Sequence, residues 1–327
     1  MDLRRRDTLL FLVASCVMPV AARAQPAAKV YRLAWLSGTP IMPSAVWTEF
    51  VAAMRELGWV EGRNYTVENL RYEGHSERLP ALAAEAVERK FDLIICAGTP
   101  PTLAAQRATT TIPIVFYFVG DPVGAGLVAT LARPGANITG LGGLGPGVYA
   151  KMLELLTEAA PRAKRIAIVV NSTFSLHAGF AADAESAARR MKLTLVPVEL
   201  RSPEGIDGAF ATIARDKADA LLILGQPFLV GQGTRVARMA IEQRLPTMVP
   251  FEGVVHEGIL MSYGSKLVDD VRRVPHYVDR ILKGASPANL PVEQPSRFYL
   301  TINRNTAKAI GLTVPVSLLQ RADQVVE

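Results

Sequence analysis

The stretch FDLIICAGTPPTLAAQRATTTIPIVFYFVGDPVGAGLV, Phe91–Val128, decides the fold of this chain. Its apolar run Leu93–Ala97 is followed by the turn Gly98-Thr99-Pro100 and by alanine-rich residues, a succession that predicts strand, turn and helix. A second apolar run ends in the same way, at Gly120-Asp121-Pro122. Two buried strands separated by a helix predict a parallel βαβ unit, in which ligands bind beside the carboxyl ends of the strands. Thr99 and Asp121 are therefore expected at one sheet edge.

The same pattern occurs again in the second half of the chain. Three segments align in order with later segments, at offsets of 127, 133 and 133 residues: Phe91–Pro100 with Ala218–Pro227, Ile112–Val115 with Leu245–Met248, and Arg32–Ala34 with Arg165–Ala167. A repeat at nearly constant offset indicates two similar α/β lobes. Two lobes imply a cleft between them.

The length of the chain agrees with two lobes. At 327 residues it exceeds what one hydrophobic core usually serves. We predict an α/β protein of two doubly wound parallel-sheet lobes joined by crossovers, with short elements after residue 258 that pass back across the cleft. The predicted boundaries are a signal peptide at 1–24, a first lobe at 29–139 plus 261–291, and a second lobe at 140–260 plus 292–327.

Residues 133–146, RPGANITGLGGLGP, contain the densest turn chemistry in the chain. Their glycines at 140, 142 and 145 match the spacing of a dinucleotide-binding fingerprint, but that fingerprint opens directly from a strand that begins a βαβ unit. Here a Pro-Gly pair precedes the glycines and Pro146 interrupts them. We therefore predict a hinge or crossover over 139–145, with too little apolar content for a core, and no bound cofactor.

The first residues predict export. Three arginines at 4–6 precede the apolar run Leu9–Val17, and Ala22-Arg23-Ala24 supplies the small residues that a signal peptidase reads. The apolar run is too short for a permanent membrane span, so we expect cleavage after Ala24 and a periplasmic protein. Two alternatives stay open: residues 13–16, which end at Cys16, also resemble a lipoprotein box, and the paired arginines are compatible with twin-arginine export.

Charge and cysteine content narrow the class of protein. The chain has a net charge of +6, and residues 1–24 hold four Arg and two Asp, so the remainder has a net charge of +4 and no basic block. That distribution lacks the electrostatic footprint of nucleic-acid binding. Cleavage after Ala24 removes Cys16 and leaves Cys96 alone in an apolar strand, where we expect a core residue without a disulfide.

Polar side chains that follow predicted strands are the candidates for ligand binding. Ser37, Thr99 and Gln226 each lie between a strand and a helix, where backbone N–H groups and the helix dipole favour a carboxylate or another anion. Each also suits a helix cap that contacts only its own backbone. Asp121 is a candidate acceptor for a ligand amine, although an Asp before Pro is also an ordinary turn residue.

Aromatic side chains follow strands as well. They are Phe174, Phe228 and Phe251 in the second lobe, and Tyr117 and Phe118 in the first. Such rings stack on a planar or apolar group, or simply cover the sheet edge. We expect the first lobe to hold the polar head of a ligand and the second lobe, with Asn171 and Gln226 beside its phenylalanines, to hold the apolar body.

The sequence contains no evident catalytic constellation. Its four His residues have no metal-binding spacing, and neither a nucleophile elbow nor a P-loop occurs. Asp121 and Glu252 are a conceivable carboxylate pair across the cleft, which keeps a secreted two-domain α/β enzyme as an alternative. A ligand-sensing partner of a signalling receptor is a further alternative.

Several long motifs resemble the bacterial ABC-transporter substrate-binding proteins of the tryptophan/tyrosine-binding type. They are LGWVEGRNYTVE at 57–68, ERLPALAAEAVERKFDLIICAGTPPTLAAQRATTTIPIVF at 77–116, GDPVGAGLVATLARPGANITGL at 120–141 and LPVEQPSRFYLTINRNTAKAIGLTVP at 290–315. The resemblance implies a type I periplasmic binding fold with three crossovers. It also implies a non-catalytic receptor that closes on a small molecule and presents it to an ABC permease in the membrane.

The resemblance places the Gly98–Pro100 turn, Asp121 and the Asn171 turn at the cleft. One departure concerns Gln226-Pro227, because relatives often carry Asp-Pro there. A neutral amide replaces a partner for an ammonium group, which argues against an amino-acid ligand. The ligand expected from the sequence is a small carboxylate-bearing molecule, with an amino-acid-like and an aromatic molecule as the open alternatives.

Overall fold

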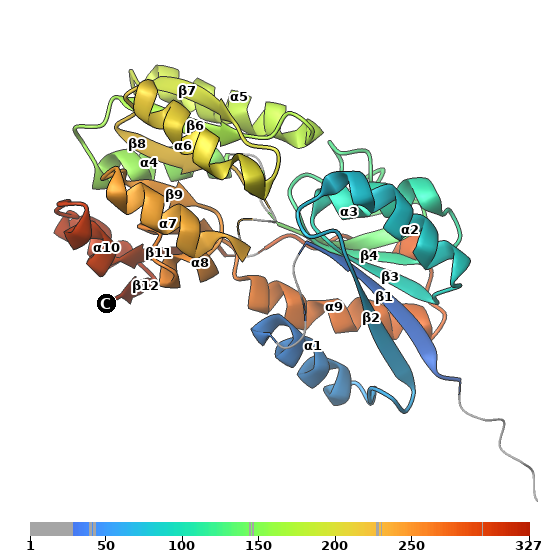
Figure 1. Cartoon of the computed structure of the whole chain (residues 1–327). Coiled ribbons are helices and arrows are strands. Elements are labelled where there is room, and N and C mark those ends of the chain that lie inside the picture. Colours follow the sequence, from blue (N-terminus) through green and yellow to red (C-terminus); the bar gives the residue numbers. More distant parts are fainter. Residues whose placement is uncertain are drawn as a thin grey trace, which may run out of the picture.

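The computed structural model describes residues 29–327 except 39, 40, 42, 43, 144, 146, 227, 228, 230 and 296. These residues form two α/β lobes, each built around its own sheet (Figure 1). The predicted signal peptide and Cys16 lie outside the described residues. In the described part of the chain, no helix is both long enough and apolar enough to cross a membrane.

The first lobe contains a sheet of five parallel strands in the order β2-β1-β3-β4-β5. The strands are β1 (Tyr31–Ser37), β2 (Tyr65–Arg71), β3 (Leu93–Ala97), β4 (Ile114–Val119) and β5 (Ile138–Gly142). Helices α1 (Ala45–Glu56) and α9 (Leu267–Leu282) cover one face, and α2 (Leu79–Glu88) and α3 (Thr99–Ala108) cover the other. Because helices cover both faces, β3 and β4 are apolar along their length, which made them recognisable in the sequence.

The second lobe contains a seven-stranded sheet in the order β12-β11-β10-β9-β8-β6-β7, in which only the β10–β11 pair is antiparallel among the described strands. The strands are β6 (Arg165–Val170), β7 (Thr194–Glu199), β8 (Ala220–Ile223), β9 (Thr247–Val249), β10 (Met261–Gly264), β11 (Tyr299–Asn303) and β12 (Gln324–Val326). One face packs against α4 (Val148–Ala159), α5 (Ser175–Arg190), α10 (Arg304–Ala309) and α11 (Val316–Arg321). The other face packs against α6 (Ile206–Arg215), α7 (Gly233–Glu242) and α8 (Gly253–His256).

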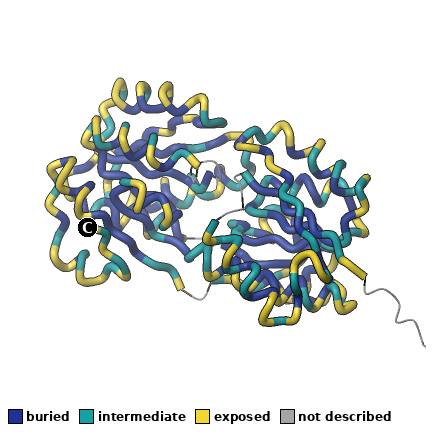
Figure 2. The backbone as a smooth tube through the Cα atoms, turned by 60° about the horizontal axis from the view of Figure 1, so that its bottom comes forward, coloured by how far each residue is buried: buried dark blue, intermediate teal, exposed yellow. Residues whose placement is uncertain are grey.

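The two sheets repeat one topology, as the sequence alignment predicted. The order β2-β1-β3-β4 in the first lobe corresponds to β7-β6-β8-β9 in the second. In Figure 2 the strands form the buried interior of each lobe, and exposed residues lie on the outer turns of the helices. Cys96, in the middle of the first sheet, is fully buried and unpaired, and burial raises the pKa of its thiol.

The prediction of a hinge over 139–145 was wrong for its first part, because residues 138–142 form the buried strand β5. Gly140 has a φ of 151°, and a Cβ built on it would lie 1.9 Å from the carbonyl oxygen of Phe116. The glycine is needed because β5 approaches the backbone of β4 closely, at the point where the register between the two strands shifts. The glycines that suggested a turn therefore permit strand pairing.

The chain passes between the sheets three times: between β5 and α4, between β10 and α9, and between the 3₁₀ turn Pro287–Asn289 and β11. Two strand positions differ from the predicted lobe boundaries, since β5 belongs to the first sheet as far as Gly142 and β10 belongs to the second. Near the crossovers, the backbone N–H of Gly142 donates to the carbonyl oxygen of Glu293 at 2.7 Å. The crossing segments are thus hydrogen-bonded to each other beside the cleft.

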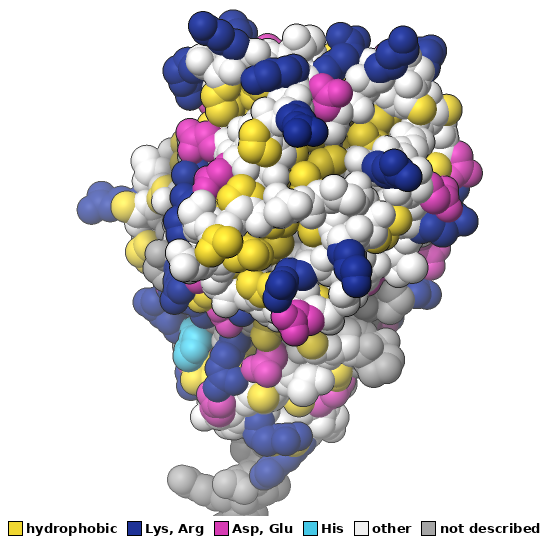
Figure 3. Space-filling model, turned by 90° about the vertical axis from the view of Figure 1, so that its left-hand side faces the viewer, with side chains coloured by type: hydrophobic (Ala, Val, Ile, Leu, Met, Phe, Trp, Pro, Cys, Tyr) yellow, Lys and Arg dark blue, Asp and Glu magenta, His cyan; other side chains and the backbone are white. Residues whose placement is uncertain are grey.

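The outer face of the second lobe is shown in Figure 3. Lys and Arg side chains are spread over this face, with Asp and Glu between them and small hydrophobic areas in between. Elsewhere in the second lobe's helices, ion pairs join Arg321 to Glu158 and Arg238 to Glu242. Basic residues do not gather into one patch on this face.

Candidate ligand-binding site

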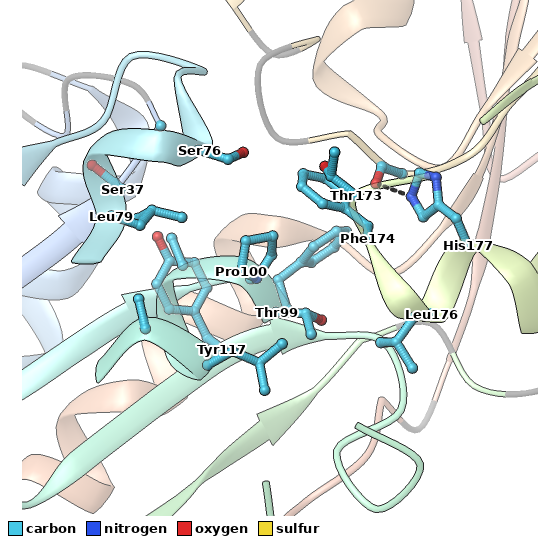
Figure 4. Close-up of a pocket in the computed structure, with 18 of the residues that line it drawn as sticks. Ser37, Ser76, Leu79, Thr99, Pro100, Tyr117, Thr173, Phe174, Leu176 and His177 are labelled. Atoms are coloured by element: carbon cyan, nitrogen blue, oxygen red, sulfur yellow. Dashed lines mark hydrogen bonds between the residues drawn. The ribbon is translucent and has the colours of Figure 1, made fainter. Parts of the chain in front are cut away.

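A cavity of about 630 Å³ lies between the two lobes. It is at the carboxyl ends of strands from both sheets, where side chains from several strands and helix N-termini converge in folds of this kind. Figure 4 shows lining side chains from the two lobes facing one another: Ser37, Leu79, Thr99 and Tyr117 from the first, and Thr173, Phe174, Leu176 and His177 from the second.

The structure brings six of the eleven predicted site residues to this cavity: Ser37, Gly98, Thr99, Pro100, Phe174 and Phe251. Phe228 lies outside the described residues. Asp121, Asn171, Gln226 and Glu252 are not among the residues that line the cavity.

The carboxylates proposed as a pair across the cleft are engaged elsewhere. Asp121 Oδ1 accepts a hydrogen bond from the backbone N–H of Gly124 at 2.8 Å, which is the turn role that an Asp before Pro often takes. Glu252 Oε1 lies 3.5 Å from Lys266 Nζ. The expectation that Asp121 and Glu252 face a ligand is therefore corrected, and the enzyme alternative loses its acid–base pair.

A hydrogen-bonded chain fixes the cavity wall in the second lobe. His177 Nδ1 accepts from the backbone N–H of Asn171 at 2.9 Å. His177 Nε2 donates to the carbonyl oxygen of Gly225 at 3.2 Å, and Figure 4 shows the position of the His177 ring. Burial lowers the pKa of His177, so the neutral imidazole is favoured, in agreement with an accepting Nδ1. The backbone N–H of Gly225 donates to Tyr149 Oη at 3.0 Å. His177 and Tyr149 thus position two strand-end turns.

The side chain of Asn171 stabilises the same cavity wall through hydrogen bonds to neighbouring backbone and side-chain groups. Its Oδ1 accepts from the backbone N–H of Thr173 at 3.0 Å and from the hydroxyl of Thr173 at 2.6 Å. Its Nδ2 donates to the carbonyl oxygen of Arg201 at 3.3 Å. Because these bonds occupy the amide, Asn171 orients the turn that carries Thr173 and Phe174. Contrary to the expectation from the sequence, Asn171 does not line the cavity.

Two of the residues that line the cavity are tyrosines, Tyr117 and Tyr149. Trp35 Nε1 donates to Tyr117 Oη at 3.3 Å, and Gly225 donates to Tyr149 Oη, so each oxygen acts as an acceptor. Neither hydroxyl proton has a hydrogen-bond acceptor within the described part of the chain. Burial raises the pKa of both Tyr117 and Tyr149, which keeps them protonated. They are therefore available donors for an oxygen acceptor on a ligand.

The N-terminus of α3 differs from the expected cluster of amide donors. Helix α3 begins at Thr99, and its next two residues are Pro100 and Pro101, which have no N–H group. Thr102 donates hydrogen bonds from both its backbone N–H and its hydroxyl to the carbonyl oxygen of Gly98. The remaining donors at this helix end are the backbone N–H and the hydroxyl of Thr99, so an anion here relies on one residue.

Aromatic rings from both lobes surround the cavity. Phe118 has a φ of 60°, a strained value for a bulky residue, at the irregularity that ends β4. Its ring lies 5.2 Å from that of Phe251, between centroids, and so connects the lobes. In the second lobe the rings of Tyr149 and Phe180 lie 4.8 Å apart. The site is suited to a planar or apolar group, with aromatic residues contributed by both lobes rather than mainly by the second.

Charge is scarce at the cavity. No Asp or Glu occurs among the described residues that line it, and Arg107 is the one permanently charged side chain in that set. The adjoining Gln226 is fully buried, and neither atom of its amide has a hydrogen-bond partner in the described structure. The described lining residues thus offer neutral donors and the guanidinium of Arg107, and they include no anionic partner for a cation.

The comparison with known families identifies this architecture. A model of the family described as ABC transporter substrate binding protein matches residues 44–326. The chain belongs to this family. Its two-lobed α/β structure is a type I periplasmic binding protein fold, shared with solved solute-binding proteins of much lower sequence identity.

Three relatives illustrate the similarity. The "Tyrosine-binding protein" of Clostridioides difficile is 27% identical over 264 residues, which are 80% of this chain and 75% of that protein. A conserved domain protein from Vibrio cholerae has a TM-score of 0.84 and 26% identity, covering 91% of this chain and 99% of its own. The ABC domain from Streptococcus pneumonia, solved in complex with L-Trp, has a TM-score of 0.82 and 23% identity, covering 91% and 100%.

Sequence reasoning missed several residues that line the cavity of this family member. His177 and Tyr149 lie in the first turns of α5 and α4, and they act on Gly225 over sequence separations of 48 and 76 residues. Arg107 lies at the far end of α3. The helical spacing of α3 was visible in the sequence, but nothing local to these three residues indicated that they reach the cleft.

Proposed function

We propose that the protein is an exported solute receptor of an ABC importer, which captures a small organic carboxylate with a planar or apolar body in the cleft between its lobes. The observation that carries the proposal is the composition of the cavity. Hydroxyl donors of Thr99, Tyr117 and Tyr149 and aromatic rings line it, while no acidic side chain occurs among its described lining residues. Such a site satisfies carboxylate oxygens and excludes water from an apolar body.

The absence of acidic side chains among the described lining residues also argues against a ligand with an ammonium group. Two relatives are a protein named for tyrosine binding and a domain solved with L-Trp, and both of these ligands carry an ammonium group. A buried ammonium without a charged partner is costly. Gln226, which follows β8, provides only a neutral amide where relatives often carry an Asp. The preferred ligand is therefore a carboxylate without an ammonium group.

Contacts between the two lobes across the cleft indicate that the lobes close when a ligand binds. His75 of the first lobe lies 3.8 Å from Glu204 of the second, between Nε2 and Oε1, and Phe118 meets Phe251 deeper in the cleft. Because lining residues come from both lobes, a bound ligand contacts both only when the lobes are closed. The ligand then shifts the population toward the closed state by its difference in affinity for the two states.

Export is supported by the arginine-led apolar segment and by the Ala22-Arg23-Ala24 site. We expect mass spectrometry of the protein isolated from the periplasm to show an N-terminus at Gln25. An acylated N-terminus at Cys16 would instead establish a lipoprotein. Transport itself requires the permease, whose loss should abolish uptake of the bound solute while binding by the purified protein is unchanged.

Isothermal titration calorimetry with matched ligands tests the proposal. Indole-3-propionate and 3-(4-hydroxyphenyl)propionate are tryptophan and tyrosine without the ammonium group. We expect them to bind more tightly than the amino acids by about tenfold or more, the effect of one unpartnered charged group. Tighter binding of tryptophan or tyrosine would contradict the carboxylate preference. Accumulation of a reaction product during incubation with either ligand would contradict a receptor function.

A further inference from the structure

The cavity extends beyond the strand ends, between two helices of the first lobe. On α3 its lining residues have the spacing of one helix face: Pro100, Leu103, Ala104, Arg107 and Ala108. On α2 and the 3₁₀ turn Ser76–Arg78 before it, the lining residues also share one face: Ser76, Leu79, Pro80 and Ala84. The two faces form the walls of an extension of the cavity, which we call the α2–α3 groove.

The groove has a definite length and chemistry. Eight residues separate Pro100 from Ala108, so it runs for about 12 Å along α3 at a helical rise of 1.5 Å per residue. Alanines at 84, 104 and 108 keep the walls low, and the leucines and prolines make them apolar. Figure 1 shows α2 and α3 side by side on one face of the first sheet. Residues near the start of both helices line the cavity, so the groove leads from there toward the far end of α3.

Arg107 lies at that far end. It is exposed, and it forms no ion pair or side-chain hydrogen bond within the described part of the chain. An arginine in the last turn of a helix also stabilises the helix dipole. That role accounts for a positive charge on α3, but not for its position at the end of an apolar groove that opens into the cavity.

We infer that the ligand is an elongated organic acid with an anionic group at each end, an inference that rests on the proposed function. One carboxylate binds the hydroxyl donors in the cleft. The apolar body lies in the α2–α3 groove, and the second anionic group meets the guanidinium of Arg107. The chemical class is an α,ω-dicarboxylate, or an aryl acid with a terminal anion, whose two charges are separated by about the length of the groove.

Titration with simple acids tests this ligand class. Sebacate and decanoate have the same chain length, but only sebacate has a second carboxylate. We expect the wild-type protein to bind sebacate about threefold to tenfold more tightly than decanoate, a modest gain because Arg107 is exposed. The gain should shrink as salt is added. Equal affinity for the two acids at low salt would overturn the role of the second anion.

Two variants with matched controls locate the effect. Arg107→Gln should remove the advantage of sebacate over decanoate, whereas Arg63→Gln, on an exposed residue that does not line the cavity, should preserve the advantage. Ala84→Phe places a bulky ring in the groove and should weaken sebacate at least about tenfold, while leaving indole-3-propionate within about twofold. Ala81→Phe, on an exposed face of α2 that does not line the cavity, is its control.

The outcomes separate the two proposals. If indole-3-propionate binds but neither Arg107→Gln nor Ala84→Phe changes the binding of sebacate, the groove inference fails and the proposed function stands. If no carboxylate binds the wild-type protein, both fail. If Arg107→Gln only lowers the stability of the protein, without changing the ratio of the two affinities, Arg107 serves the helix dipole alone and the inference is overturned.

Discussion

Asp270→Asn should stabilise this protein at neutral and alkaline pH. Asp270 is 6% exposed in the first turn of α9, directly after the crossover from β10. Its Oδ2 accepts a hydrogen bond from the hydroxyl of Ser265 at 2.8 Å. Burial raises the pKa of Asp270 to about 6 from an ordinary value of 3.8, and Asp269 adds to the rise while Arg273 opposes it. The folded protein therefore holds this proton more tightly than the unfolded chain does.

The sign of the effect follows from that difference in pKa. Below a pH of about 4 both states are protonated, and the raised pKa does not affect stability. As the pH rises from about 4 to about 6, the unfolded chain loses its proton first, so the free energy of unfolding falls. Above a pH of about 6 the cost is complete. A difference of about two pKa units corresponds to about 3 kcal/mol. Asparagine keeps the acceptor for Ser265 and removes this cost.

Urea denaturation of the ligand-free protein at pH values of about 4 and 8 measures the effect. We expect Asp270→Asn to raise the free energy of unfolding by about 1–3 kcal/mol at the higher pH and by much less at the lower. Asp269→Asn is the matched control, because Asp269 is exposed in the same turn and should cost about 0.3–1 kcal/mol through the helix dipole. If Asp270→Asn destabilises the protein equally at both pH values, the buried charge is compensated and the reasoning is refuted.

Three further predictions concern the strand pairing, the site and closure. Gly140→Ala should destabilise the protein by more than about 3 kcal/mol in urea denaturation, because its Cβ would meet the carbonyl oxygen of Phe116 at 1.9 Å; Gly179→Ala, in open space on α5, should not destabilise it. Tyr149→Phe leaves the Gly225 N–H without its acceptor and should cost about 1–3 kcal/mol of stability; it should also weaken indole-3-propionate about tenfold, and unchanged affinity would place the carboxylate elsewhere. Small-angle scattering should show a smaller radius of gyration at saturation with indole-3-propionate, and an unchanged radius would contradict closure.

Much of the fold could be predicted because the buried strands have a local signature. β3 and β4 are continuous apolar runs bounded by turns, and the corresponding strands β8 and β9 repeat them. β5 was missed because its glycines resemble a turn. The need for Gly140 arises from the neighbouring backbone of Phe116, which is 24 residues away in the sequence. A short or glycine-rich strand carries too little apolar surface of its own to be recognised without its partner.

The residues of the candidate site could also be predicted from the sequence only in part. The position after a strand was enough to bring Ser37, Thr99, Phe174 and Phe251 to the cavity, because parallel strands end at one edge. The Pro100-Pro101 pair, already visible in the sequence, limits the donors at the start of α3. The position after a strand did not reveal that Asp121 accepts a hydrogen bond from its own loop. Nor did it reveal that Glu252 forms an ion pair with Lys266.

The sequence by itself determined the two lobes, the strand-end location of the cleft and the neutral amide at Gln226, because each of these depends on the order of residues along the chain. The tertiary structure decided which side chains face the ligand. His177, Tyr149 and Arg107 reach the cavity from helices whose orientation is set by packing against the sheets. The direction of a side chain on a helix depends on which face is buried, and that is a property of the assembled core rather than of the local sequence.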